Sequence, residues 1–236
     1  MILVPTYNER ENIRRLLPQI FSLQPNVSVM VIDDNSPDGT ADAVRRLQPA
    51  HGGLFLFERE KKEGLGRAYI AALRKVMEDF PEIEVIGTMD ADWSHRPSEL
   101  QSLLAAIKNY DCVIGSRYIP GGKISGWEKR RVWLSRAANG YCRLITSLPL
   151  SDVTSGFCCY RRSAIKKLVF SALDPTGYAF QIHLKYLLWR QGATFLEVPI
   201  CFNRRQNGES KISLAVIMEG ILIPWRLRWT KYISHT

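Results

Sequence analysis

The chain has 236 residues, of which 46% are hydrophobic and 23% are charged, as in an ordinary globular protein. This length fits one large domain or two small ones, and it is ample for a hydrophobic core. The formal net charge of +9 is concentrated in residues 126–143 and 224–232, where arginine and lysine are interleaved with tryptophan and tyrosine. This mixture fits binding to nucleic acid or to an anionic membrane surface, and charge alone does not choose between them.

The first half of the chain alternates short apolar runs with helical patterns. Strands are expected at residues 1–4, 27–32, 54–58, 84–90 and 111–117. Helices are expected at residues 8–23, 33–47, 65–80 and 97–107. This alternation predicts an α/β fold with a mainly parallel sheet flanked by helices. Ligands bind such sheets at the carboxyl ends of the strands, a rim that here comprises residues 5–9, 33–34, 90–92 and 116–117.

The second half continues the pattern and ends in an apolar run. We expect a basic, amphipathic helix at 129–148, a strand at 155–162, a helix at 178–192, a strand at 193–202 and a polar loop at 203–211. The apolar run from Ile212 to Trp225 is too short to span a bilayer, which takes about 20 apolar residues. A buried helix and a helix at a membrane interface fit it about equally. We therefore divide the chain into a main domain, 1–211, and an amphipathic C-terminal helix, 212–236.

The five cysteines predict a reducing, cytoplasmic setting. They form no CxxC pair and no metal-ligand spacing, and the adjacent Cys158 and Cys159 suit a buried strand better than a disulfide. The first residues, MILVPTYNERE, have no basic start and only a short apolar run. We therefore expect no secretory signal.

Two like charges, Asp90 and Asp92, stand where the strand expected at 84–90 ends. Residues i and i+2 of an extended chain point to the same side, so the carboxylates repel each other unless a positive charge lies between them. Hard oxygen ligands suit Mg²⁺ or Mn²⁺, which completes its coordination with phosphates and water. The pair therefore predicts a divalent cation that holds a diphosphate. Alternatively, Asp92 only turns the chain into the helix that Pro97 opens, and Asp90 is solvated.

Other residues of this rim fit a nucleotide. The ring of Tyr7 can stack on a base, and Asp34 can accept hydrogen bonds from ribose hydroxyls. The segment Gly64-Leu65-Gly66 is a weaker signal, because the third glycine of a dinucleotide fingerprint is missing.

Seven motifs together resemble the polyprenol-phosphate (dolichol-phosphate) mannosyltransferases, family 2 glycosyltransferases with the GT-A (Rossmann-like) fold. In chain order they are PTYNERENI, VIDDNSPDGT, EGLGRAYIAAL, MDADWSHRP, GSRYIPGG, SDVTSGF and EVPICFNRRQNGESKIS, and they extend from the first residues to about Ser213. The resemblance implies that residues 1–211 form a GT-A catalytic domain. It also implies inverting transfer of mannose from GDP-mannose to a polyprenyl or dolichyl phosphate, with Mg²⁺ or Mn²⁺ as cofactor.

The resemblance assigns roles to individual residues. The donor nucleotide would be bound by Pro5, Tyr7, Glu9, Asp34, Asp90, Ala91, Arg204 and Lys211. The metal ligands would be Asp90, Asp92 and Ser94. The acceptor phosphate would be bound by Arg117, Arg131 and Ser135. The catalytic residues would be Asp92, Arg117 and Arg131.

Elementary chemistry supports this assignment at the acceptor. Arg131 and Ser135 are spaced i,i+4 and would share one face of a helix, where a guanidinium and a hydroxyl form a sensible phosphate clamp. A phosphomonoester is already ionised at neutral pH, so the acceptor needs no general base. The protein must instead orient it, neutralise the like charges and stabilise the departing diphosphate.

Some features depart from the family pattern. His183 stands where relatives usually have an acid, and Arg67 stands where small residues are common; we assign neither a role. Some relatives carry transmembrane helices after the catalytic domain, and this chain resembles the short form without them. The resemblance therefore implies a peripheral protein on the cytoplasmic face of a membrane, which reaches its lipid through interfacial helices or a membrane-anchoring subunit.

Three alternatives remain open at this point. The same fold could use another donor, such as UDP-glucose. A basic nucleic-acid-binding module would explain the net charge, but acids at the strand ends would repel phosphates in the absence of a metal; we therefore expect no nucleic-acid partner. A catalytically inactive membrane scaffold would require that the acids be replaceable, and the intact DAD motif counts against it.

Overall fold

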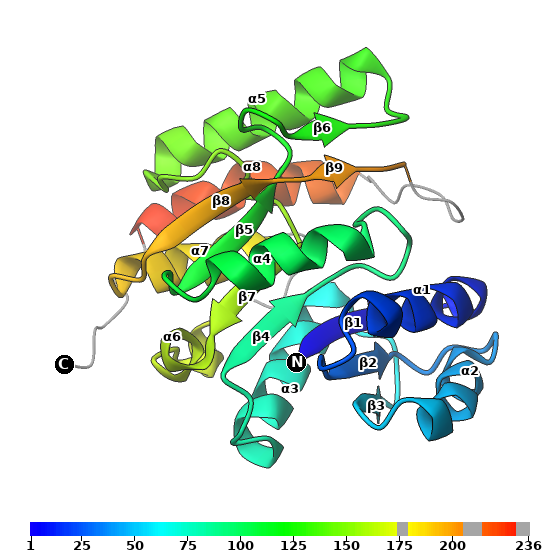
Figure 1. Ribbon diagram of the computed structural model, residues 1–236. Helices are drawn as coiled ribbons and strands as arrows, with labels where there is room; N and C mark the ends of the chain where they lie inside the picture. The colour runs from blue at the N-terminus through cyan, green and yellow to red at the C-terminus, as the bar shows by residue number, and fades with distance from the viewer. Residues whose placement is uncertain (174–178, 205–213, 230–236) are drawn as a thin grey trace.

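The computed structural model describes residues 1–173, 179–204 and 214–229. Its centre is a seven-stranded sheet with the order β3-β2-β1-β4-β7-β5-β8 (Figure 1). These strands are β1 (Ile2–Thr6), β2 (Val29–Asp33), β3 (Leu54–Glu58), β4 (Val85–Thr88), β5 (Cys112–Ser116), β7 (Cys158–Arg161) and β8 (Phe195–Pro199). A separate two-stranded sheet pairs β6 (Lys123–Ile124) with β9 (Cys201–Phe202). The mainly parallel α/β sheet predicted from the sequence is confirmed.

One strand, β7, runs opposite to the others. It pairs antiparallel with both β4 and β5, while the remaining pairs of the large sheet are parallel. Because β7 is reversed, the segment that precedes it, 151–157, lies at the same rim as the carboxyl ends of the parallel strands. This reversal brings a further loop to the rim where ligands are expected.

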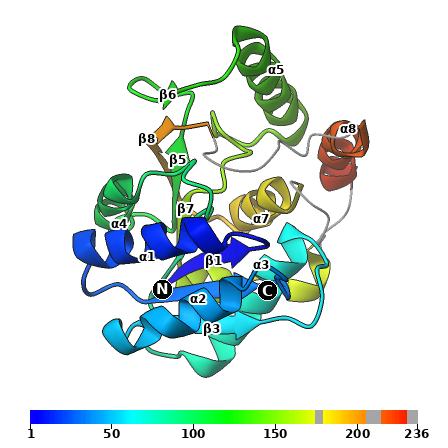
Figure 2. The same ribbon diagram turned by 90° about the vertical axis from the view of Figure 1, so that its right-hand side faces the viewer.

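Helices cover both faces of the sheet (Figure 2). The helices are α1 (Arg10–Leu23), α2 (Thr40–Leu47), α3 (Leu65–Asp79), α4 (Leu100–Ala106), α5 (Lys129–Thr146), α6 (Arg162–Lys166), α7 (Ala179–Arg190) and α8 (Leu214–Trp229). One hydrophobic core joins α1, α2 and α4 to the sheet, and a second core joins α3, α5, α6, α7 and α8 to its other face. In α1 the fully buried Ile13, Leu16, Leu17 and Ile20 follow the spacing of one helix face.

Most expected elements are shorter at their ends than predicted, and two departures have a clear physical cause. The helix expected at 33–47 begins only at Thr40, because Asp33 and Asp38 bind backbone N–H groups of the turn: Asp33 accepts from Ser36, and Asp38 accepts from Thr40. The strand expected at 193–202 is two strands, β8 and β9. The chain leaves the large sheet after Pro199, whose ring nitrogen cannot donate a hydrogen bond, and then pairs with β6.

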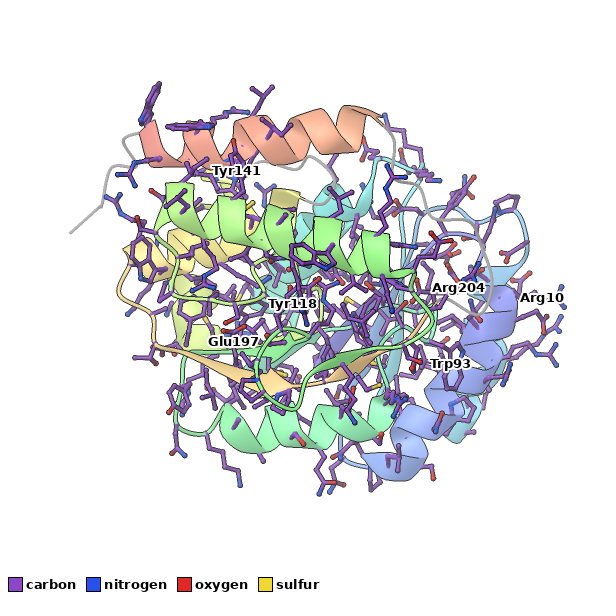
Figure 3. All side chains as sticks on the ribbon, turned by 90° about the horizontal axis from the view of Figure 1, so that it is seen from above. Arg10, Trp93, Tyr118, Tyr141, Glu197 and Arg204 are labelled. Atoms are coloured by element: carbon purple, nitrogen blue, oxygen red, sulfur yellow. The ribbon has the colours of Figure 1, made fainter. Side chains whose placement is uncertain are left out.

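The C-terminal helix α8 packs on α5 and α7. Ile223 and Leu227 are buried in the core, and the Trp225 indole N–H donates to the Tyr141 hydroxyl of α5 over 2.9 Å. The Tyr141 hydroxyl in turn donates to the carbonyl of Ile221 over 2.8 Å. Figure 3 shows Tyr141 between the two helices. No helix in the described parts of the chain is long and apolar enough to cross a bilayer, in agreement with the expectation from the sequence.

The segment 151–157 is fixed by buried charges. Arg117, at the end of β5, donates from Nε and Nη2 to the two carboxylate oxygens of Asp152, each over 2.7 Å. Lys185 of α7 is fully buried and donates to the carbonyls of Val153 and Ser155 over 3.1 and 2.6 Å. The Glu197 carboxylate of β8 accepts from the backbone N–H groups of residues 151 and 152. This loop is therefore held from three elements.

We expect Asp152→Asn to lower the free energy of unfolding by about 3–5 kcal/mol at pH 7, because it leaves the buried Arg117 without its partner. Burial alone would raise the pKa of Asp152, but the charge and hydrogen bonds of Arg117 outweigh it and lower this pKa below its ordinary value. The ionised carboxylate therefore stabilises the fold above about pH 4, and this contribution is lost as the pH falls through the folded-state pKa.

Urea unfolding at pH 7 and at lower pH measures this effect. The difference between Asp152→Asn and the wild type should shrink below about pH 4. The control is Asp79→Asn, which alters an exposed pair with Lys75 and should leave stability unchanged. Equal stability of Asp152→Asn and wild type at pH 7 would contradict the assignment.

Candidate active site

The rim predicted from the sequence is the place where the structure gathers its polar loops. The ends of β1, β2, β4 and β5 lie on it, together with the loop 151–157 and the end of β8. Three non-glycine residues in these loops, Asn8, Asn35 and Trp93, have φ angles of 60°, 55° and 66°. Asparagine tolerates this left-handed conformation, but for a bulky tryptophan it is strained. Such strain clusters at functional sites.

At the end of β2, the adjacent aspartates have different partners. Asp33 accepts hydrogen bonds from the hydroxyls of Thr6 and Ser36 and serves the turn. Asp34 forms a buried ion pair with Arg59, with 2.7 Å between Oδ1 and Nη1. Burial raises the pKa of Asp34 and outweighs the opposing effect of Arg59. Arg59 and the backbone N–H of Glu63 therefore already engage the Asp34 carboxylate, which has further lone pairs to accept from a nucleoside.

The other residues predicted to bind the donor nucleotide lie nearby. Pro5 belongs to β1, and Tyr7 and Glu9 follow it; all three are partly buried. The Nζ atom of Lys62 lies 3.7 Å from the centre of the Tyr7 ring. Arg59 and Lys62, neither of which was predicted from the sequence, therefore add positive charge where a nucleotide is expected.

The DAD motif forms a tight loop after β4. The Asp90 N–H donates to Nδ1 of His95 over 3.1 Å, and the Ser94 N–H donates to Oδ1 of Asp92 over 3.0 Å. Because Nδ1 accepts, the proton of the neutral imidazole is on Nε2. Burial lowers the pKa of His95, whose ring stacks on Phe157 at 4.8 Å. Ala91 is buried in the core beneath this loop.

The oxygen atoms of this loop fit a divalent cation. The Asp90 side chain is 28% exposed, and Asp92 and Ser94 are buried. The Ser94 hydroxyl makes no hydrogen bond to any described residue. In the described part of the chain, no group of three or more histidine, cysteine or acidic side chains is arranged to hold a metal ion by itself. Two carboxylates and a hydroxyl are hard ligands that suit Mg²⁺ or Mn²⁺, provided that a diphosphate and water complete the shell.

Three residues predicted to bind the acceptor phosphate lie on β5 and α5. Arg117 is fixed by Asp152 and by Thr154, whose hydroxyl accepts from Nη2 over 2.7 Å; its Nη1 makes no hydrogen bond within the described structure. The Tyr118 hydroxyl donates to Oγ of Ser135 over 2.6 Å. This bond ties α5 to the end of β5 and therefore holds Ser135 near Arg117. Arg131 lies one turn earlier on α5, and its guanidinium lies 3.9 Å from the centre of the Trp127 ring.

The last predicted donor residues lie beyond β9. Arg204 is exposed, and its N–H donates to the carbonyl of Ser125 over 3.0 Å. Figure 3 shows Arg204 and Trp93 at the same end of the molecule, where Arg10 of α1 also lies. Lys211 falls outside the described residues. The structure thus places Arg204 at the edge of the rim, and the contribution of Lys211 stays a prediction.

Two residues to which no role was assigned lie apart from these groups. His183 is buried in α7, and Arg67 is exposed in α3 and pairs with Glu63, which precedes that helix. Other residues of this region were missed from the sequence: Arg59, Tyr118, Asp152 and Thr154. Three of them lie in motifs that the sequence analysis named: Tyr118 in GSRY, and Asp152 and Thr154 in SDVTSGF. Nothing in either motif indicates that GSRY and SDVTSGF contact each other in the fold.

Comparison with known proteins identifies the family of the chain. The family model for glycosyl transferase family 2 matches residues 1–169. The polyprenol monophosphomannose synthase of Mycolicibacterium smegmatis is 39% identical over 238 residues, covering 97% of this chain and 87% of the relative. The undecaprenyl-phosphate mannosyltransferase of Micrococcus luteus is 37% identical over 222 residues, covering 94% of this chain and 90% of the relative.

Solved structures share the fold at low sequence identity. Glucosyl-3-phosphoglycerate synthase from Mycobacterium tuberculosis, in complex with Mn²⁺, UDP and phosphoglyceric acid, superposes with a TM-score of 0.67 at 18% identity, over 98% of this chain and 78% of that chain. The mannosyltransferase PcManGT from Pyrobaculum calidifontis, in complex with GDP-Man and Mn²⁺, gives a TM-score of 0.60 at 20% identity, over 89% and 57%. The fold is therefore of the GT-A type, and the chain belongs to glycosyl transferase family 2.

Proposed function

We propose that the protein is an inverting mannosyltransferase that moves mannose from GDP-mannose to a polyprenyl phosphate. The observation that supports this most is that one loop, 151–157, links acidic and basic groups at the same rim: its Gly156 lies against Asp90, and its Asp152 binds Arg117. The acids would hold a metal-bound diphosphate, and the arginines a second phosphate. The curated relatives described above bear the names of enzymes with this activity.

The reaction needs few groups from the protein. An oxygen of the acceptor phosphate attacks the anomeric carbon from the face opposite the diphosphate, the bond from that carbon to the diphosphate breaks, and the configuration inverts. No proton must be removed, because the phosphomonoester is already ionised. Asp90, Asp92 and Ser94 would hold Mg²⁺ or Mn²⁺, which when bound stabilises the negative charge on the leaving diphosphate. GDP leaves with that charge.

The acceptor side positions and neutralises the nucleophile. Asp152 holds the Arg117 guanidinium in one orientation, with Nη1 as the donor that remains for a phosphate oxygen. Arg131 and the Ser135 hydroxyl would complete the clamp from α5. Fixed donors in a partly buried site cost little reorganisation when charge moves. Arg204 and Lys211 would close over the donor, and with them the catalytic part would span residues 1–211.

The lipid acceptor fits the apolar outer surface of α5 and α8, which pack against each other. Among the described side chains of the two helices, the exposed large apolar ones are Trp133, Leu134, Leu144, Ile221, Leu222, Trp225 and Trp229. Exposed arginines, Arg136 on α5 and Arg226 and Arg228 on α8, flank them. Aromatic and basic side chains together suit an anionic membrane surface. We propose that this surface, rather than a membrane span, brings the protein to the cytoplasmic face of a membrane, either alone or with an anchoring subunit.

The residues around Tyr7 and Asp34 fit a nucleoside of either base, so the experiment offers both donors. The test is transfer of radiolabel from GDP-mannose or UDP-glucose to polyprenyl phosphate with Mn²⁺ or Mg²⁺, followed by counting of the organic phase. Label from GDP-mannose alone is expected, and an excess of EDTA should abolish it. Label from UDP-glucose alone would preserve the mechanism and change the donor. If neither donor gives label with a folded protein, the proposed function is wrong.

Arg131→Ala should raise the KM for polyprenyl phosphate by about 10- to 100-fold, the effect of a lost charge-assisted hydrogen bond. The KM for GDP-mannose should stay within about twofold, since Arg131 is assigned to the acceptor alone. Steady-state kinetics with each substrate varied in turn measures both. The matched control is Arg130→Ala, the exposed neighbour on α5, which should change neither value. An unchanged acceptor KM for Arg131→Ala would place the phosphate elsewhere.

Replacing both Trp133 and Trp229 by serine should weaken binding to anionic liposomes by about tenfold or more, because two exposed aromatic anchors are lost. Co-sedimentation at low salt measures this. The control is Leu23→Ser, which alters an exposed apolar side chain at the end of α1, away from this surface. Equal sedimentation of the double variant and the wild type would show that this surface of α5 and α8 does not bind the membrane.

A further inference from the structure

Gln181 in the first turn of α7 is a buried polar side chain without a partner. It is 3% exposed, and neither its amide oxygen nor its amide nitrogen makes a hydrogen bond within the described residues. A buried amide left unpaired costs stability, so native proteins seldom retain one without a reason. The other two glutamines with described amide contacts, Gln48 and Gln191, donate to the carbonyls of Leu54 and Lys167. Gln181 therefore needs a separate explanation.

The Gln181 amide lies beside the carboxylate of Asp90. Gly156 separates the two: a Cβ atom at this glycine would lie 3.6 Å from Oδ1 of Asp90 and 3.8 Å from Nε2 of Gln181. Both polar groups are thus within 4 Å of one point. The carbonyl of Gly156 accepts a hydrogen bond from the Thr88 hydroxyl over 2.7 Å, which fixes it at the end of β4. The preceding residue of α7, Phe180, stacks on Tyr69.

A Cβ alone would make only ordinary van der Waals contacts here, so the chemistry of the amide is what limits the ligand. Any side chain at position 156 would enter the space between the Asp90 carboxylate and the Gln181 amide. The amide presents one acceptor and two donor hydrogens, and both kinds are unsatisfied. A phosphate offers only acceptors and would leave Oε1 unpaired. A sugar hydroxyl both donates and accepts, so adjacent hydroxyls of one hexose can satisfy the whole amide.

We propose that Gln181 binds hydroxyl groups of the transferred hexose and contributes to the choice of donor sugar. The proposal rests on the proposed function, in which Asp90 faces the donor diphosphate, and it adds a residue to the sugar side of that site. The hydrogen bonds that the Gln181 amide lacks within the protein would then be supplied by the donor sugar. A site built to bind a hydroxyl in this way discriminates strongly against an analogue that lacks it.

The test compares Gln181→Met, which keeps the length and replaces the amide by an apolar group, with Gln191→Met as the matched control. For Gln181→Met we expect kcat/KM with GDP-mannose to fall by about 10- to 100-fold, the effect of one or two lost hydrogen bonds. GDP lacks the sugar, so its affinity by calorimetry should stay within about twofold. The melting temperature should be unchanged or higher, because no protein hydrogen bond is lost.

Donor analogues that each lack one hexose hydroxyl sharpen the result. The wild type should lose activity with the analogue whose missing hydroxyl pairs with Gln181, and Gln181→Met should lose nothing further with it. Gln191→Met should respond to every analogue as the wild type does, although its melting temperature should fall, because it loses the bond to Lys167.

Three outcomes would overturn the inference. Activity of Gln181→Met within twofold of the wild type would show that the amide does not contact the sugar. A lower melting temperature together with lower affinity for GDP would show a structural role. If each deoxy analogue lowers the activity of Gln181→Met by the same factor as that of the wild type, the amide does not pair with any of the missing hydroxyls. If Gln181→Met does not fold, Gln181→Asn, which withdraws the amide by one methylene, takes its place in the same comparisons.

Failure of the proposed function is recognised separately. If wild-type protein transfers sugar from another nucleotide, the same comparison is made with that donor and its nucleoside diphosphate. If it transfers none, calorimetry of the sugar nucleotide against its nucleoside diphosphate still tests the amide. Equal affinities of the wild type for the two would overturn the inference.

Discussion

The buried ion pair between Arg117 and Asp152 is the interaction on which the rest of the site depends. It joins the end of β5 to the loop that precedes the reversed strand β7, two segments 35 residues apart in sequence. The Thr154 hydroxyl, in the same loop, receives hydrogen bonds from Arg117 and from Asn139 of α5. The pair therefore fixes the guanidinium, the loop and the helix relative to one another. Without Asp152, the desolvated charge of Arg117 would have to find another arrangement.

This constraint has consequences on both sides of the rim. On the proposed acceptor side it fixes Arg117, whose neighbour Tyr118 holds the Ser135 hydroxyl of α5. On the donor side, the same loop places Gly156 against Asp90 and Gln181. Both proposed substrates carry phosphates, so the problem for the protein is to bring like charges together. In the proposed mechanism, a metal held by the acids and fixed arginines would solve it without a general base.

The sequence predicted the architecture well because the apolar strands and amphipathic helices have local signals. The carboxyl rim followed from the alternation of strands and helices, and Asp90 and Asp92 were singled out by their spacing. The start of α2 was predicted too early, because side chains such as Asp38 decide where a helix begins. Ion pairs such as Asp34–Arg59, 25 residues apart, have no local signature. Neither does the unpartnered amide of Gln181, which is visible only when its surroundings are known.

The central claim is that an ionised phosphate, rather than a hydroxyl activated by a base, is the nucleophile. The most direct measurement compares two acceptors of equal chain length, a polyprenyl phosphate and the free polyprenol, with labelled GDP-mannose and Mn²⁺. The account predicts product from the phosphate and no product from the alcohol at any pH between 6 and 9. Comparable transfer to the alcohol would contradict it, because the protein would then have to supply a base.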